Sequence, residues 1–202
     1  MKRLWSLLAP LLLAACSPPS VPDVTYFRLP PPAPLARAAR PLSALPIEVG
    51  VFRGEGIYAE QALIYSLSAD AGALRTYHYQ LWSDPPSRGL QARLTAMLRA
   101  AGIAPLVTER LPASDPALRV HGRILRYERI PREGGYKAVV AFEMRVEQDS
   151  GEPLIEQTYA AEAAAADASM AATVQAFASA VDQAFARFYD DLAARGQDSH
   201  AG

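Results

Sequence analysis

Apolar and polar residues alternate in several short segments of the chain, and this two-residue period predicts β-strands with one buried face. The clearest segment is 137–147, in which Phe142 and Met144 alternate with Glu143 and Arg145. Other segments show the alternation or are rich in β-branched and aromatic residues, which strands favour. We therefore also expect strands at residues 24–29, 47–51, 62–67, 74–82, 104–108, 118–124 and 154–161.

Two segments instead repeat apolar residues every three or four positions, which predicts helices with one buried stripe. The first helix is expected to begin near Asp84, whose carboxylate would cap it, and to end at Gly102 as the C′ glycine. Ser169 is expected to cap the second helix. The first stripe consists of Leu90, Leu94, Met97, Leu98 and Ala101, and the second of Val174, Phe177, Val181, Phe185, Phe188 and Leu192. The arginines that avoid the first stripe are Arg88, Arg93 and Arg99.

The order of these elements predicts the fold class. Residues 118–161 form a three-strand meander, with turns at 131–135 and 149–151. Each helix has one apolar stripe that must be covered. We therefore expect an α+β fold in which a single antiparallel-rich sheet has two main helices packed on one face.

The first 16 residues predict export and lipid attachment. Lys2 and Arg3 precede an apolar run of about ten residues, which is too short to span a membrane and typical of a secretory signal. The sequence Leu13-Ala14-Ala15-Cys16 has the form of a lipobox. It predicts cleavage before Cys16, diacylglycerol on the Cys16 thiol and an N-acyl chain. Because Ser17 and not aspartate follows, the lipoprotein sorting rule favours the periplasmic face of the outer membrane. An ordinary signal peptide with an incidental cysteine is the alternative.

These features set the expected domain limits. Residues 1–15 are the signal peptide, 16–23 a lipidated Pro-rich tether, 24–195 the folded domain and 196–202 a disordered tail. Segment 17–46 contains nine prolines, which favour extended chain. The exception is the β-branched and aromatic segment 24–29, which is either a first strand docked on the domain or an apolar patch in a disordered linker.

Composition excludes several functions. Residues 16–202 carry 18 basic and 21 acidic side chains without a basic cluster, so a nucleic-acid partner is not expected. Cys16 is the only cysteine, and its acylation would leave no thiol for disulfides, thiolate catalysis or metal binding.

Residue spacing gives no sign of catalysis. His78 and His121 lie on predicted strands without acidic neighbours at ligand spacing, and His200 is in the tail, so no metal site is expected. Glu128 is expected to be a solvated charge beside a hairpin. No nucleophile or phosphate-binding motif occurs, and we expect neither enzymatic activity nor a cofactor apart from the lipid on Cys16. The aromatic residues Tyr77, Tyr79 and Trp82 either form an interface or pack beneath the first helix.

Several stretches together resemble the ABC-type transport auxiliary lipoproteins, a family that includes the lipoprotein of the paraquat-inducible Pqi system. Besides the lipobox, these are Thr25-Tyr26-Phe27-Arg28-Leu29-Pro30, Ile47-Glu48-Val49-Gly50-Val51, Tyr58, Ile64-Tyr65 and Tyr77-His78-Tyr79-Gln80-Leu81-Trp82-Ser83-Asp84-Pro85-Pro86. One departure is Ala59-Glu60-Gln61, where members often carry a Leu-Asp-Arg-like run. It puts in doubt any partner contact made by that loop.

The resemblance implies an outer-membrane lipoprotein without catalytic activity. It would dock an MCE-domain protein that spans the periplasm and, through it, an inner-membrane ABC permease and ATPase, in a lipid transport system. A homo-oligomeric ring is compatible with this role. Tyr58, Tyr77, Tyr79 and Trp82 are the candidate partner-binding residues. The alternative function is a stand-alone binder of lipid or another envelope component, which would need an apolar pocket between sheet and helices; a periplasmic hydrolase is disfavoured by the absent motifs.

Overall fold

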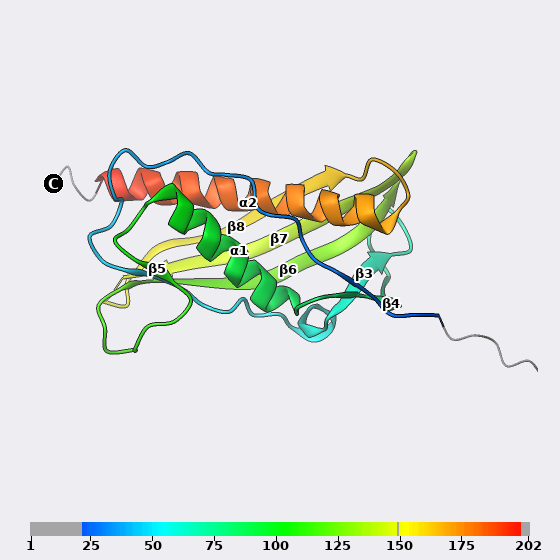
Figure 1. Cartoon of the computed structure of the whole chain (residues 1–202), viewed down its shortest axis with the longest axis horizontal. Helices are drawn as coiled ribbons and strands as arrows, with labels where there is room; N and C mark the ends of the chain where they lie inside the picture. The colour runs from blue at the N-terminus through cyan, green and yellow to red at the C-terminus, as the bar shows by residue number, and fades with distance from the viewer. Residues whose placement is uncertain (1–21, 149, 199–202) are drawn as a thin grey trace, which may run out of the picture.

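The computed structural model describes residues 22–148 and 150–198, which form an eight-stranded sheet covered on one face by two helices (Figure 1). The predicted signal peptide and Cys16 lie outside the described residues. The predicted α+β class, with both helices on one face of a single sheet, is confirmed. In chain order the elements are β1 Thr25–Phe27, β2 Ile47–Val49, the 3-10 helix η2 Gly56–Ala59, β3 Ala62–Ser66, β4 Leu74–Trp82, α1 Pro86–Ala101, β5 Val107–Thr108, β6 Leu118–Arg132, β7 Gly135–Glu147, β8 Pro153–Ala164 and α2 Met170–Asp198.

The predicted three-strand meander is the antiparallel series β6, β7 and β8. Phe142 and Met144 of β7 are fully buried, as the alternation predicts. β6 continues to Arg132, well past the predicted end at residue 124, because a register shift between Ile124 and Arg126 lets the strand continue. A bulge of this kind changes the phase of the alternation, so that Tyr127 joins Ile124 in the core.

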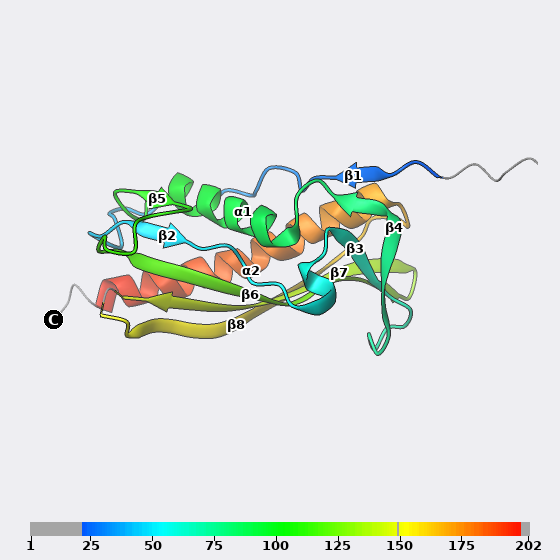
Figure 2. The ribbon, with the colours of Figure 1, turned by 90° about the horizontal axis from the view of Figure 1, so that it is seen from below.

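The other strands add parallel pairings that alternation alone does not predict. β1 lies parallel beside β4, with Tyr26 opposite Leu81, and so the prediction that segment 24–29 docks as a strand is confirmed for Thr25–Phe27. β2 lies parallel between β5 and β6. Parallel neighbours need a long crossover connection, and the chain from β2 to β5 passes through β3, β4 and α1 (Figure 2).

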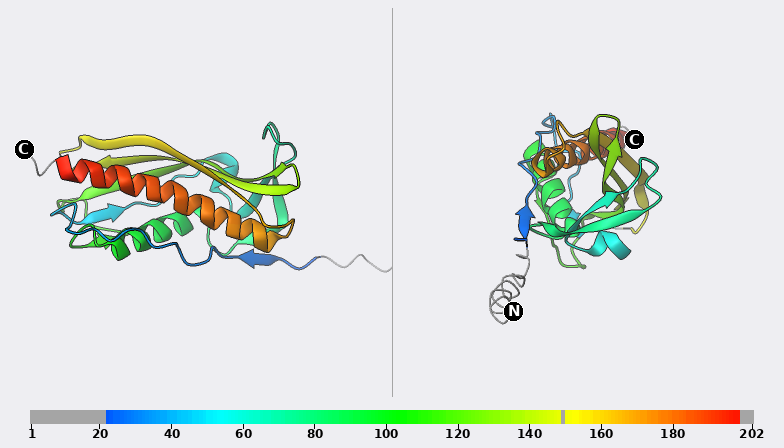
Figure 3. Two further views of the ribbon diagram at one scale, coloured as in Figure 1. Left: turned by 90° about the horizontal axis from the view of Figure 1, so that it is seen from above. Right: turned by 90° about the vertical axis from the view of Figure 1, so that its right-hand side faces the viewer.

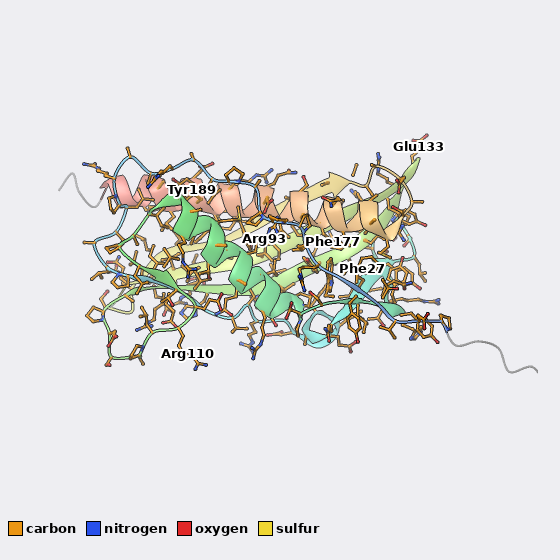
Figure 4. All side chains as sticks on the ribbon, viewed as in Figure 1. Phe27, Arg93, Arg110, Glu133, Phe177 and Tyr189 are labelled. Carbon is orange, nitrogen blue, oxygen red and sulfur yellow. The ribbon has the colours of Figure 1, made fainter. Side chains whose placement is uncertain are left out.

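Helix α1 has the predicted buried stripe and the predicted C-terminal glycine, but not the predicted N-cap. Gly102 has φ 68°, the left-handed conformation that glycine adopts without strain. The prediction for Asp84 is wrong, because Pro85 occupies the N-cap position and the Asp84 carboxylate instead accepts a hydrogen bond from the Ser83 hydroxyl. Arg93 lies outside the apolar stripe, as expected, but it is nevertheless buried. Its side chain is 5% exposed and faces α2 (Figure 4).

Helix α2 crosses β7 and β8, and its stripe of apolar residues is buried against them. Ser169 caps it as predicted: the hydroxyl accepts a hydrogen bond from the Ala172 amide at 3.1 Å. The helix continues to Asp198, past the expected domain end at residue 195. Within residues 22–148 and 150–198, neither helix has both the length and the hydrophobicity needed to cross a membrane.

Removal of the α2 cap gives a direct test of this helix end. Ser169→Ala is expected to lower the free energy of unfolding by about 1 kcal/mol, because the Ala172 amide loses its acceptor. Ser179→Ala, at an exposed position inside the same helix, is the control and should change stability by less than about 0.5 kcal/mol. Equal effects of the two substitutions in urea unfolding would show that the cap does not contribute.

Candidate functional site

The segment between β1 and β2, residues 28–46, runs along the outside of α1 and α2 and is fastened to both helices (Figures 1 and 3). We call it the strap. The Ala38 amide donates to the carbonyl of Ala101 at 2.9 Å, and the Tyr189 hydroxyl donates to the carbonyl of Ala36 at 2.8 Å. The described part of the Pro-rich N-terminal segment is therefore docked on the domain.

A buried ion pair joins the strap to both helices. Arg93 of α1 donates two hydrogen bonds to the Asp182 carboxylate of α2, at 2.7 and 2.8 Å. A third donor of Arg93 reaches the carbonyl of Pro30 at 2.6 Å, and Asp182 accepts from the Ala33 amide at 2.9 Å. Arg93 and Asp182 thus bond to each other, and each also bonds to one backbone group of the strap. These contacts fix the position of the strap over the helices.

An apolar pocket of about 560 Å³ lies where the strap leaves β1 and passes the start of α1. We call it the strap pocket. Its walls come from three parts of the chain: Phe27 to Pro32, the first turns of α1, and the core residues Trp82 and Tyr127. On the α1 side the wall includes the small residues Gly89, Ala92 and Ala96. A Cβ atom added at Gly89 would meet no other atom within 4 Å, so the space beside this residue is open.

The four predicted partner-binding aromatics lie in different environments. Trp82 is 4% exposed and its ring packs edge-on against Phe177 and near Tyr127. Its side chain belongs to the core and one wall of the strap pocket, and offers a partner almost no surface. Tyr58, Tyr77 and Tyr79 are half-buried. Partner binding by these three tyrosines stays a prediction.

Tyr58 closes over a buried carboxylate that sequence reasoning placed in solvent. Glu128 is 1% exposed, so the expectation that it is a solvated charge is wrong. Its carboxylate accepts hydrogen bonds from the Tyr58 hydroxyl and the Arg126 guanidinium, both at 2.8 Å. The reason for its burial is η2, which packs against this part of β6. No local signal announces the contact, because Tyr58 and Glu128 are 70 positions apart.

Tyr77 belongs to a second cluster, around Arg129. Arg129 is 7% exposed; its guanidinium lies 3.3 Å from the centre of the Tyr136 ring and donates to the Tyr77 hydroxyl and to the carbonyl of Ala168. The Tyr65 ring packs against Tyr77 at 4.4 Å between centroids. Aromatic faces stabilise a desolvated guanidinium, so this cluster joins β3, β4, β6 and β7 at one end of the sheet.

The raised pKa values of one half-buried and two buried tyrosines predict a loss of stability at high pH. Burial raises the pKa of Tyr58, Tyr127 and Tyr159 above the ordinary value of 10.0, and the neighbouring carboxylates of Glu128 and Asp191 raise that of Tyr58 and Tyr159 further. The folded protein therefore holds these protons more tightly than the unfolded chain. Their contribution to the free energy of unfolding is complete below pH 10 and is lost as the pH rises above it.

The free energy of unfolding is thus expected to stay level up to about pH 9 and to fall steeply above about pH 10. Urea unfolding at a series of alkaline pH values measures it. Tyr159→Phe removes one of the contributing tyrosines and should make the fall shallower. A free energy that is unchanged through about pH 11 would contradict the prediction.

Within the part of the chain that the structure describes, no three His, Cys, Asp or Glu side chains come together in a way that could hold a metal ion. His78 is exposed, and His121 faces Glu147 across β6 and β7 at 3.5 Å. The main features around the strap are an apolar pocket and a paired charge.

The fold and the strap define a class of α+β domain in which an open mixed sheet carries two helices and a Pro-rich N-terminal segment is fastened across them. The sequence profile of the ABC-type transport auxiliary lipoprotein component matches residues 27–187. The chain belongs to this family. The family is a transport auxiliary component and not an enzyme family, and its lipoprotein character implies a membrane-anchored location in the cell envelope.

Solved structures share the fold. Protein XCC0632 from Xanthomonas campestris, described as belonging to DUF330, has a TM-score of 0.75 at 15% identity, over 88% of this chain and 100% of its own. A second crystal structure, of an uncharacterized protein, has a TM-score of 0.66 at 16% identity, over 84% of this chain and 98% of its own. At these identities the likeness concerns the fold alone. No curated protein matches the sequence.

Proposed function

We propose that this protein is an outer-membrane-anchored accessory lipoprotein of a lipid transport system of the ABC/MCE type, and that it docks a periplasm-spanning MCE assembly by protein–protein binding. Through that assembly it serves an inner-membrane ABC permease and ATPase. The observation that carries the proposal is the family match over residues 27–187, directly downstream of the lipobox at Leu13-Ala14-Ala15-Cys16. Ser17 after the cysteine supports the outer membrane as its destination.

The pairing of β1 with β4 supports a docking role, because it shortens the free tether. Because β1 begins at Thr25, only residues 16–24 separate the proposed lipid from the folded domain. Nine residues of fully extended chain span at most about 32 Å. A domain on so short a tether stays near the membrane surface, which suits a protein that fixes one end of a larger assembly. A ring of like subunits would suit the same role.

Localisation and docking need separate experiments. Cys16→Ser is expected to abolish acylation and to remove the protein from the outer-membrane fraction, whereas the wild-type protein should carry fatty acyl groups and sediment with that fraction. For docking, the detergent-solubilised lipoprotein is immobilised and incubated with a purified MCE-domain protein from the same organism. Capture is the expected result; no capture across several detergents and salt concentrations would overturn the docking proposal.

The half-buried Tyr79 of β4 is the most useful position for testing the predicted partner surface, because its hydroxyl makes no hydrogen bond to other side chains or backbone within residues 22–148 and 150–198. Tyr79→Ala is expected to weaken capture of the MCE protein. Leu106→Ala, at an exposed apolar residue beside β5 and at the opposite end of the molecule from β4, is the control (Figure 2). Equal capture by both variants would show that Tyr79 is not part of the partner surface. The docking proposal itself would then still be decided by capture with the wild-type protein.

A further inference from the structure

The strap pocket has the composition of a site for an extended apolar chain. Phe27, Leu29 and Leu90 line it together with the rings of Trp82 and Tyr127, so its walls are mainly carbon. The one charged group near its floor, Arg93, is already paired with Asp182. A ligand in the pocket would therefore bury apolar surface without leaving a charge unpaired, which is the favourable case for a flexible hydrocarbon.

The shape and size of the strap pocket narrow the ligand class. About 560 Å³ lies within the usual range for small-molecule sites, roughly 300–1,000 Å³. Gly89, Ala92 and Ala96 follow one another along α1 at the pocket wall, and their small side chains leave the groove beside the helix unfilled. The opposite wall is Pro30 to Pro32, whose backbone has no N–H group to leave unsatisfied in an apolar site.

The mouth of the strap pocket differs from its walls, because Arg28, Ser83 and Asp84 also line it and are exposed or half-buried. Arg28 and Asp84 supply one positive and one negative charge, which is complementary to a zwitterionic head group, while the Ser83 hydroxyl donates to Asp84. We propose that the strap pocket binds one acyl chain of a membrane phospholipid, with the head group at Arg28 and Asp84. This inference does not depend on docking to an MCE protein.

The position of the strap pocket along the chain favours a lipid taken from the membrane. Phe27 is the eleventh residue after Cys16, and eleven residues span at most about 40 Å when fully extended. On the proposed anchor, the pocket mouth therefore stays within that distance of the bilayer. Figure 4 shows Phe27 toward the end of the molecule from which the N-terminal segment leaves, with Arg93 of α1 nearer the middle.

Photo-crosslinking in membranes tests the proposal with the full acylated protein. The protein is reconstituted into vesicles of phosphatidylethanolamine and phosphatidylglycerol that contain a phospholipid with a photoactivatable acyl chain. After illumination, the modified residues are mapped by mass spectrometry. We expect adducts on strap-pocket residues such as Leu29, Leu90 and Ala96.

Two matched substitutions on α1 distinguish pocket binding from surface contact. Gly89→Trp extends into the open space of the strap pocket, whereas Ala100→Trp adds the same bulk at an exposed position outside it. Gly89→Trp should reduce the pocket adducts by about tenfold or more, because exclusion of two methylene groups alone is sufficient for that change. Ala100→Trp should leave them unchanged. If Gly89→Trp fails to fold, Ala92→Phe at the same wall replaces it.

Two outcomes would overturn the proposal. The first is a set of adducts spread over the membrane-facing surface and unaffected by Gly89→Trp. The second is occupation of the pocket by the protein's own anchor, detected when a photoactivatable fatty acid incorporated at Cys16 in cells gives the pocket adducts and the added phospholipid gives none. Capture of the MCE protein is measured on the same variants, so that a failure of docking and a failure of lipid binding are observed separately.

Discussion

Asp182→Ala is expected to lower the free energy of unfolding by about 3–5 kcal/mol, because it leaves the Arg93 guanidinium buried without a counter-charge. The same substitution removes the acceptor of the Ala33 amide, so the strap is expected to loosen as well. Urea unfolding measures the first effect. Hydrogen exchange at the Ala33 amide measures the second, and exchange should become faster in the variant.

The double variant Arg93→Met/Asp182→Leu separates the two effects. Replacing both charges with apolar side chains removes the unpaired cation and should restore most of the lost stability. It does not restore the acceptor for Ala33, so exchange at that amide should remain fast. Glu162→Ala, which breaks the exposed pair with Lys137, is the control and should change stability by less than about 1 kcal/mol. A loss as small as this for Asp182→Ala would show that the pair does not hold the strap.

The ion pair also shows that hydrophobic periodicity does not predict every buried position of a helix. The stripe from Leu90 to Ala101 correctly identifies the side of α1 that faces the sheet. A helix in a two-helix layer has a second buried side, where it meets its neighbour, and the residue on that side is Arg93. Its partner, Asp182, is 89 positions away in α2, so neither residue carries a local sign of burial.

The positions of the strands could be predicted from the sequence, but their pairings could not. Alternation reports only that one face of a segment is buried, and it correctly located β7, whereas aromatic-rich composition located β4. It contains no information on neighbours, so the parallel pairing of β2 with β5 and β6 was not predicted. The extension of β6 past Ile124 was missed because the bulge changes the phase of the pattern, which resembles the end of a strand.

The candidate site was predictable only in part, because it is assembled from segments that are distant in sequence. The strand character of segment 24–29 indicated that part of the Pro-rich region docks on the domain. The strap pocket itself requires Phe27, Leu90 and Tyr127 to meet, and only the tertiary structure brings them together. Similarly, an aromatic residue such as Trp82 has the same sequence signature whether it lies at an interface or in the core.

Gly122→Ala is expected to destabilise the domain by about 1–3 kcal/mol, although alanine is normally the better residue in a strand. The added Cβ would lie 2.5 Å from the Phe52 ring, far inside van der Waals contact. Phe52 cannot move aside, because it is 1% exposed and its ring packs between Phe142 and Phe185, each 5.8 Å away between centroids. Chemical denaturation of the variant measures the loss.

A second substitution at the contact tests whether this clash is the cause. Phe52→Leu leaves room beside the strand, so the double variant Phe52→Leu/Gly122→Ala should lose less stability than the two single variants together. Gly72→Ala is the control, because its Cβ would meet only the Asp70 carboxylate at 3.6 Å, an ordinary contact, and no loss is expected. Additive losses in the double variant would mean that Gly122 is required for a reason other than close packing against Phe52.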